Sequence, residues 1–231
     1  MIFFLYLCKI HKTLTMKRIL FLILALFASF YFTAAAQESE YTITKGGDKP
    51  VKVHWTVKKL NDGNTQLNII FGCRKSIQVL DRNYRTLSWY LCDSDLDVDA
   101  KVVLKDGFYH ITGKIKGKNI DRKEKSSGLP WYQNIGLSGG YVLKGANASV
   151  TYESVRPSNM EIYPMKSTFV EETTLNGLKV WDMKTTPNGV LSKLWSCHYY
   201  ICTSTNGNRF IGYRGVEGAP GTEETVWTLT K

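Results

Sequence analysis

The stretch "VKVHWTVKKLNDGNTQLNIIFG", residues 51–72, contains the pattern that decides the fold. In its first nine residues apolar side chains occupy every second position, from Val51 to Val57, and polar side chains lie between them. Because successive side chains of a strand point to opposite faces, this alternation predicts a half-buried strand. Asp62-Gly63 then suits a tight turn with positive φ, and another apolar run follows. The stretch is therefore a predicted β-hairpin.

Similar short runs, separated by turn signals, fill most of the chain from residue 51 onward. Further turns are expected at Asp106-Gly107, Asn176-Gly177, Pro187-Asn188-Gly189 and Asn206-Gly207. The stretch 118–149 is rich in Gly, Ser and Lys and is interpreted as a long loop with at most one short helix, near Tyr132. The sequence predicts a mainly β fold: a single antiparallel curved sheet, half-barrel or barrel, with a sandwich as the further alternative.

The N-terminal segment is typical of a signal peptide. Lys17-Arg18 precede an apolar run over residues 19–32, and Ala34-Ala35-Ala36 supply the small residues that a signal peptidase requires. The run is shorter than the roughly 20 residues that span a bilayer, which favours cleavage over anchoring. We expect Met16 to be the true start, residues 1–15 to be an upstream over-extension, residues 16–36 to be the signal peptide, and residues 37–231 to form one β-rich domain.

The charge balance limits the class of partner. Four basic residues and no acidic residue precede residue 37, so the mature chain has 26 basic against 20 acidic residues, a net charge of +6. A mildly basic exported protein favours a lipid, an anionic envelope polymer or a membrane surface as its contact. Nucleic acid is not expected in the periplasm or outside the cell. No cofactor is predicted, and the oligomeric state is left open.

Four cysteines remain in the mature chain, and an oxidising compartment permits disulfides. A hairpin between Cys73 and Cys92 favours a disulfide between these two residues. Cys197 and Cys202 are an odd number of positions apart in one predicted strand, so they point to opposite faces and are not expected to bridge. The alternative, four buried thiols, stays open.

Three glycines at three-residue intervals, Gly215, Gly218 and Gly221, raise the question of a phosphate-binding loop. Such a loop needs a helix directly after it, because the helix N-terminus binds the anion. Here the stretch that follows leads through two glutamates to Trp227 and Leu229 and is interpreted as a strand. A hairpin loop is therefore favoured over an anion site.

The most unusual stretch is "DSDLDVDA", in which Asp93, Asp95, Asp97 and Asp99 alternate. Carboxylate clusters suit hard cations, which makes this stretch the calcium candidate of the sequence. The helix–loop–helix calcium pattern nevertheless fails, because Val98 takes its sixth position. The favoured interpretation is a solvated acidic loop or edge strand, and no metal is expected.

Three residues are candidates for ligand binding. Trp131 and Tyr132 lie in the loop-rich stretch after Pro130, where aromatic side chains cap grooves or stack on sugars. Packing of both rings onto the sheet is the alternative. His198 lies in an aromatic strand, and its alternative is a buried, hydrogen-bonded core histidine. No nucleophile–base pair emerges from the spacing, so no catalytic residue is predicted.

Two segments carry a resemblance to known proteins. They are "PWYQNIGLSGGYVLKG", residues 130–145, and "NGNRFIGYRGVEGAPGTEETVWTL", residues 206–229. Both resemble uncharacterised exported β-rich proteins of Gram-negative bacteria, which are domain-of-unknown-function families. The resemblance implies an architecture similar to the half-barrels of periplasmic lipoprotein carriers, in which a curved sheet encloses an apolar groove. It implies no catalytic residue.

The function predicted from these features is a secreted or periplasmic, non-enzymatic protein that binds an apolar or envelope-derived ligand in a β-sheet groove. One alternative is a hydrolase that acts on envelope glycan or lipid. The other is a structural or interaction module without a small ligand. An apolar groove without convergent titratable groups favours the first, and a cleft that contains His198 or two close carboxylates favours the second.

Overall fold

The computed structural model describes residues 36–143, 148–202, 209–216 and 222–231. The predicted signal peptide up to Ala35, the segment before it, and the predicted Asn206-Gly207 turn lie outside the described residues. Residues Ala36–Lys231 form one compact unit. No helix among the described residues is long and apolar enough to cross a membrane.

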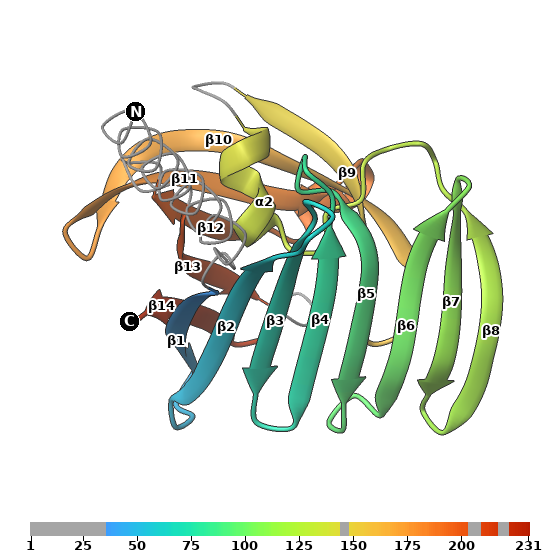
Figure 1. Cartoon of the computed structure of the whole chain (residues 1–231). Coiled ribbons are helices and arrows are strands. Elements are labelled where there is room, and N and C mark those ends of the chain that lie inside the picture. Colours follow the sequence, from blue (N-terminus) through green and yellow to red (C-terminus); the bar gives the residue numbers. More distant parts are fainter. Residues whose placement is uncertain (1–35, 144–147, 203–208, 217–221) are drawn as a thin grey trace, which may run out of the picture. The chain divides into compact units, whose positions relative to one another are not determined.

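In the described residues, fourteen strands form one antiparallel sheet, as predicted (Figure 1). The sheet does not close on itself, a point that the sequence left open. The strands are β1 (Gln37–Lys45), β2 (Val51–Lys59), β3 (Thr65–Phe71), β4 (Arg74–Leu80), β5 (Thr86–Asp93), β6 (Val98–Lys105), β7 (Phe108–Ile115), β8 (Lys118–Lys125), β9 (Ser149–Val155), β10 (Ile162–Leu175), β11 (Leu178–Pro187), β12 (Cys197–Cys202), β13 (Arg209–Val216) and β14 (Glu224–Leu229). Their spatial order is β8-β7-β6-β5-β4-β3-β2-β1-β14-β13-β12-β11-β10-β9, so β8 and β9 are the edges. The described residues also contain one α-helix, α2 (Ile135–Val142), and one 3-10 helix, η1 (Val190–Lys193).

The alternating runs form strands where they are expected. In β2, Val53 and Trp55 are buried, whereas Lys52 and His54 are exposed. Two of the predicted turns connect adjacent strands through pairs of positive φ angles, 53° and 75° at Asp106-Gly107 and 52° and 76° at Asn176-Gly177. These angles belong to the two-residue turn that matches the right-handed twist of paired strands. Local turn chemistry therefore sets the hairpin register.

Three segments differ from expectation. Residues 118–125, predicted as loop, form edge strand β8, which has few apolar side chains because an edge faces solvent. The sequence predicts two separate strands, "MEIYPM" at residues 160–165 and "STFVEETTL" at residues 167–175, but the structure has one long strand, β10. The strand expected directly after Asn188-Gly189 is replaced by η1, and β12 starts only at Cys197.

The question of the spaced glycines is settled by the strands on either side of them. β13 and β14 pair antiparallel, with Tyr213 opposite Trp227, so a hairpin connects them. Gly218 and Gly221 lie outside the described residues. Gly215 lies in β13 itself, where a Cβ atom would lie 2.4 Å from Cys197 Cβ. Close packing of strands therefore explains Gly215, and the predicted hairpin is confirmed.

The sheet has an inner face, defined here as the face that α2 covers. α2 lies inside the curve of the sheet, against β12 and β13 (Figure 1). Asn134 caps its N-terminus by accepting a hydrogen bond from the Leu137 N–H at 3.0 Å. A Cβ atom on Gly139 would lie 2.3 Å from Met183 Cε, so glycine lets the helix approach the sheet closely.

A second element on the inner face is the covering segment, residues 126–134. Its Trp131 carbonyl accepts a hydrogen bond from the Thr86 N–H at 2.7 Å, and Trp131 forms a parallel bridge with Glu153 of β9. The Tyr132 N–H donates to the Glu153 carbonyl at 3.0 Å. The covering segment thus connects β5 to β9, two strands that are far apart in the order of the sheet.

Candidate functional site

The inner face contains a cavity of about 470 Å³, here called the inner cavity. Its lining residues are Trp55, Arg74, Leu96, Gln133, Asn134, Arg156, Pro157, Ser158, Trp195, Tyr199, Phe210, Tyr213 and Trp227. A volume of this size falls within the range of about 300–1,000 Å³ that small-molecule sites occupy. The inner cavity is therefore the candidate functional site.

Six aromatic side chains form one side of the inner cavity, the aromatic wall: Trp55, Trp195, Tyr199, Phe210, Tyr213 and Trp227. Trp55 of β2 stacks on Phe210 of β13, with ring centroids 5.0 Å apart and an interplanar angle of 16°. Trp227 meets Trp55 edge-on at 6.3 Å. The Trp195 Nε1–H donates to the Val216 carbonyl at 2.6 Å. These contacts fix the rings, so the wall is preformed.

The other lining residues, which are polar or cationic apart from Leu96 and Pro157, come from four places: the start of β4, the β5–β6 turn, the residues before α2 and the residues after β9. Gln133 is held by its own bonds, since its amide nitrogen donates to the Val155 carbonyl at 2.8 Å and its Oε1 accepts from Trp131 Nε1. Ser158 and Arg156 follow β9. The inner cavity is therefore amphipathic, with a ring-lined side and a side that offers polar and cationic groups.

Two arginines line the inner cavity, and their environments differ. Arg74 forms an ion pair with Asp93, whose side chain is only 1% exposed. The Arg74 guanidinium also lies 4.6 Å from the Phe71 ring centroid. Arg156 is exposed and, within the described ranges, its side chain has no hydrogen bond or ion pair. One of the two positive charges is therefore compensated inside the protein and the other is not.

The two loop aromatics predicted to bind ligand are buried away from the inner cavity. Trp131 is 1% exposed and packs edge-on against Tyr109 of β7, with ring centroids 5.2 Å apart. Tyr132 is also buried and packs edge-on against Tyr152. Neither lines the inner cavity, although Gln133 and Asn134, which follow them, do. The structure therefore places these rings in the core, which was the alternative interpretation.

A buried carboxylate holds the covering segment in place. Glu153 accepts hydrogen bonds from Ser126 Oγ at 2.6 Å, the Ser127 N–H at 2.7 Å and Tyr109 Oη at 2.7 Å. Burial opposes ionisation, but these donors outweigh it, and the pKa of Glu153 lies below its usual value. Burial and the hydrogen bond to Glu153 raise the pKa of Tyr109. Glu153 therefore acts as a structural anion that joins β7, β9 and the covering segment.

His198 does not contact the inner cavity. It alternates along β12 with Tyr199, which lines the inner cavity, so its side chain points to the opposite face of the sheet. There His198 Nδ1 lies 2.7 Å from Asp182 Oδ1, and the histidine is about one-third exposed. The structure therefore shows a hydrogen-bonded histidine on the outer face, not a core histidine and not a residue of the inner cavity.

The acidic stretch does not form a single cluster. Asp93 ends β5 and its Oδ1 accepts from the Asp95 N–H at 3.0 Å, which caps the following turn. Asp97 takes a positive φ of 50° in this turn, and Asp99 lies exposed in β6. Since a turn interrupts the alternation, the four carboxylates do not share a strand face.

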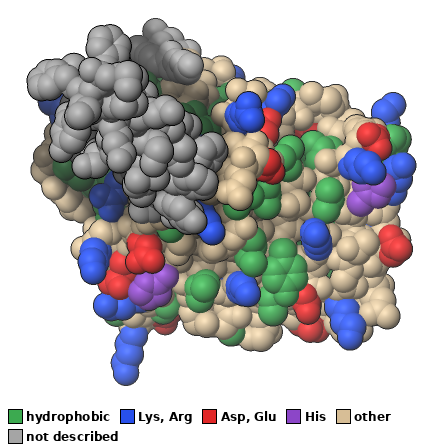
Figure 2. All heavy atoms as spheres, in the orientation of Figure 1, with side chains coloured by type: hydrophobic (Ala, Val, Ile, Leu, Met, Phe, Trp, Pro, Cys, Tyr) green, Lys and Arg blue, Asp and Glu red, His purple; other side chains and the backbone are tan. Residues whose placement is uncertain are grey.

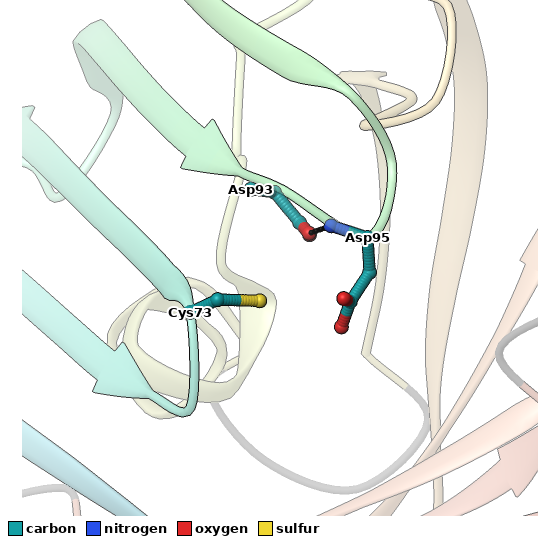
Figure 3. A group of neighbouring side chains, drawn as sticks. All are labelled: Cys73, Asp93 and Asp95. Atoms are coloured by element: carbon teal, nitrogen blue, oxygen red, sulfur yellow. Dashed lines mark hydrogen bonds between the residues drawn. The ribbon is translucent and has the colours of Figure 1, made fainter.

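Asp93, Asp95 and Cys73 do converge, with ligand atoms within 4.8 Å of one another (Figure 3). Asp93 is already engaged by Arg74, and the other two residues are exposed. The group lies in the β3–β4 and β5–β6 turns. The three side chains are of types that can bind a metal ion, but no other feature of this group points to a bound cation.

All four described cysteines are free thiols. Cys73 is exposed, and Cys92 is half-buried on β5, opposite Lys75 of β4. The β4–β5 hairpin forms as predicted, but Cys73 Sγ lies beside Asp93, and Cys92, the residue before Asp93 in β5, alternates with it and points to the other face. Cys197 and Cys202 are buried and belong to clusters on opposite faces of the sheet, as their odd spacing predicts.

The face of the sheet that Figure 2 shows carries lysine, arginine and acidic side chains interspersed with hydrophobic ones. In β8, Lys118, Lys123 and Lys125 are exposed. Arg122 instead donates to the Met160 carbonyl at 2.7 Å and the Asn159 carbonyl at 3.2 Å. Arg122, unlike the exposed lysines of β8, therefore has a structural role.

Comparison with known proteins supports this architecture. No family model matches the sequence, and no curated protein matches it. The crystal structure of a beta-barrel-like protein of the domain of unknown function DUF1849 from Brucella abortus matches 85% of this chain and 96% of its own, with a TM-score of 0.58 and 8% identity. This chain is similar to it in fold. The predicted resemblance to a β-rich family of unknown function is thereby confirmed at the level of fold.

A DUF1329 family protein from Desulfovibrio piger matches 86% of each chain at 13% identity. Its TM-score of 0.28 is too low for any structural argument.

The residues of the inner cavity were missed by sequence reasoning for different reasons. The rings of the aromatic wall lie in strands, where alternation assigns them to the core and gives no sign of an open space beside them. Arg156 follows β9 in the sequence "SVRPSN", where it resembles any solvated turn residue. One signal was present in the sequence: Gln133 and Asn134, which lie directly before α2, belong to the segment that carries the resemblance.

Proposed function

We propose that this protein is an exported, non-enzymatic binding protein that holds an apolar or envelope-derived ligand in the inner cavity. The observation that carries the proposal is the aromatic wall: six rings from four strand regions border a volume of about 470 Å³. Apolar sites in proteins are typically concave, ring-lined and largely preformed. The similarity in fold to a beta-barrel-like domain is compatible with such a groove.

The residues that line the inner cavity give no support to the hydrolase alternative. Within the described part of the chain they include no histidine, cysteine, aspartate or glutamate, whereas hydrolysis of glycans or lipids uses paired acids or a nucleophile with a base. Among the same residues Ser158 is the only lining residue with a hydroxyl on an aliphatic carbon, and none of them is a base. The His198–Asp182 pair lies on the opposite face.

A titration with N-phenyl-1-naphthylamine, a neutral apolar fluorophore, tests the proposal. We expect saturable binding at one site. Trp195→Ala should weaken binding about tenfold, since the loss of one aromatic contact removes about 1.4 kcal/mol. The matched control is Trp181→Ala, because Trp181 is also half-buried but packs on Phe169 and does not line the inner cavity. Equal affinity in both variants, or no saturable binding, would contradict the proposal.

Export belongs to the same proposal and has its own test. Residues 16–36 have the features of a signal peptide, so the mature protein should start at Gln37. N-terminal sequencing of protein recovered from the envelope or medium should find this residue. A product that retains residues 16–36 inside the cell would contradict export without affecting the binding proposal.

A further inference from the structure

The lining of the inner cavity separates into an apolar part and a cationic part. The aromatic wall comes from β2, β13, β14 and the region of β12, whereas both arginines lie among the residues outside it. A ligand that matches both parts carries an apolar body and a negative charge. No carboxylate lines the inner cavity among the described residues, and the nearby Asp93 carboxylate is paired with Arg74.

Arg74 is not the residue that an anion would meet first. Its guanidinium is paired with Asp93, and the same carboxylate accepts the N–H groups of Asp95 and Leu96 at 3.0 and 3.2 Å. Removing Arg74 from this pair would leave a buried carboxylate without its cation, which is costly. Arg74 therefore holds the β5–β6 turn and does not provide a free charge.

Arg156 differs from Arg74 because its backbone is fixed by hydrogen bonds while its side chain is unpaired within the described residues. Its N–H donates to the Glu161 carbonyl and its carbonyl accepts from the Met160 N–H, both at 2.8 Å. Met160 is fully buried, and Arg122 of β8 donates to its carbonyl. The turn that carries Arg156 is thus fixed at its base, while the guanidinium has no partner within the described part of the chain.

We propose that the inner cavity binds a single-chain anionic amphiphile, with the chain against the aromatic wall and the anionic group on Arg156. This inference rests on the proposed function and specifies its ligand class. A guanidinium presents parallel N–H groups that match the oxygens of a carboxylate or a phosphate, and such charge-assisted pairs are stronger than neutral hydrogen bonds. Both kinds of head group share this chemistry.

Three chain-matched probes separate charge from chain: dodecanoate, dodecyl phosphate and the neutral dodecanol, each below its aggregation concentration. Displacement of N-phenyl-1-naphthylamine from the wild-type protein reports their affinities. We expect the two anions to bind at least tenfold more tightly than dodecanol. A difference between dodecanoate and dodecyl phosphate would identify which head group the site prefers.

Arg156→Gln removes the charge and keeps a polar side chain of similar length. We expect it to weaken binding of both anions by at least tenfold and to leave dodecanol unchanged, whereas Arg156→Lys should retain part of the affinity. The matched control is Arg214→Gln, because Arg214 is exposed in β13 and pairs with Glu224. Unchanged unfolding temperatures would show that the variants are folded.

The outcomes distinguish the two proposals. If dodecanol binds as tightly as the anions, or if Arg156→Gln binds the anions normally, the anionic head group is wrong but the apolar site stands. If N-phenyl-1-naphthylamine binds but none of the three probes displaces it, the amphiphile class is wrong and the apolar site stands; if N-phenyl-1-naphthylamine does not bind either, both proposals are wrong. Loss of anion binding in Arg214→Gln as well as Arg156→Gln would show a general charge effect and would overturn the assignment to Arg156.

Discussion

Two regions of the inner face differ in how their aromatic residues are used. Over β5, β6 and β7 the covering segment packs Trp131 against Tyr109, and the space is filled. Over β2, β13 and β14 the rings of the aromatic wall border an open volume. The same residue types therefore fill the space near the β8 edge of the curved sheet and border the inner cavity over its middle strands, depending on which segment crosses the inner face.

The two regions should differ most in how much one aromatic ring contributes to the free energy of unfolding. Trp131→Ala should lower the free energy of unfolding by about 3–5 kcal/mol, because it removes a fully buried ring. Trp195→Ala should cost less, since Trp195 is only half-buried. Urea unfolding of both variants measures this. A loss below about 1 kcal/mol for Trp131→Ala would mean that the covering segment does not hold the sheet.

Glu153→Gln tests the anion that fixes the covering segment. We expect a loss of about 1–3 kcal/mol at neutral pH, because three donors lose a charged acceptor. The pKa of Glu153 is lowered in the folded state, so its contribution is present above the unfolded value of about 4.3 and disappears as the pH falls through the folded pKa.

Chemical unfolding of wild type and Glu153→Gln between pH 7 and pH 3 measures this dependence. The difference in stability between the two proteins should stay constant from pH 7 to about pH 5 and shrink in acid. A difference that grows as the pH falls would contradict a carboxylate stabilised as an anion.

Gly139→Ala tests whether α2 depends on close approach to the sheet. The added Cβ would lie 2.3 Å from Met183 Cε and 2.9 Å from Ile201 Cδ1, so we expect a loss of about 1–3 kcal/mol. Combined with Met183→Ala, the cost should be less than the sum of the single changes. Additive costs in thermal or urea unfolding would show that the helix does not press on Met183.

The smallest effect concerns the thiols. In reduced, folded protein Cys73 should react rapidly with a disulfide reagent such as dithionitrobenzoate, because it is exposed. Cys197 and Cys202 should react only after unfolding, since both are buried. Stability should be unaffected by Cys73→Ser. Fast reaction of Cys197 or Cys202 would place these clusters nearer to solvent than the structure does.

Much of the fold follows from local patterns in the sequence. The alternation in β2 and the Asn176-Gly177 and Asp106-Gly107 turns are short-range signals, because side-chain direction and positive φ are properties of a few neighbouring residues. β8 escaped this reasoning, since an edge strand with Ile120 as its only aliphatic side chain does not show an apolar face. The replacement of a strand by η1 has no local signal that we identify.

The site was less predictable than the fold because it depends on contacts between distant segments. Whether Trp131 fills space or binds ligand is decided by the contacts of the covering segment with Thr86 and Glu153, which no spacing encodes. Strand periodicity predicts that His198 and Tyr199 point to opposite faces of the sheet, but it does not predict which of these faces carries the cavity. The turn that carries Arg156 is held by hydrogen bonds to Met160 and, through the Met160 carbonyl, to β8, and the local sequence gives no sign of these contacts.

Native mass spectrometry of the protein purified gently from its own envelope tests the central claim most directly. We expect a complex that is heavier than the mature polypeptide by one single-chain amphiphile, and a smaller share of this complex in Trp195→Ala prepared in the same way. A spectrum that contains only the mass of the unliganded polypeptide, from wild type and variant alike, would contradict the claim that the inner cavity is a binding site.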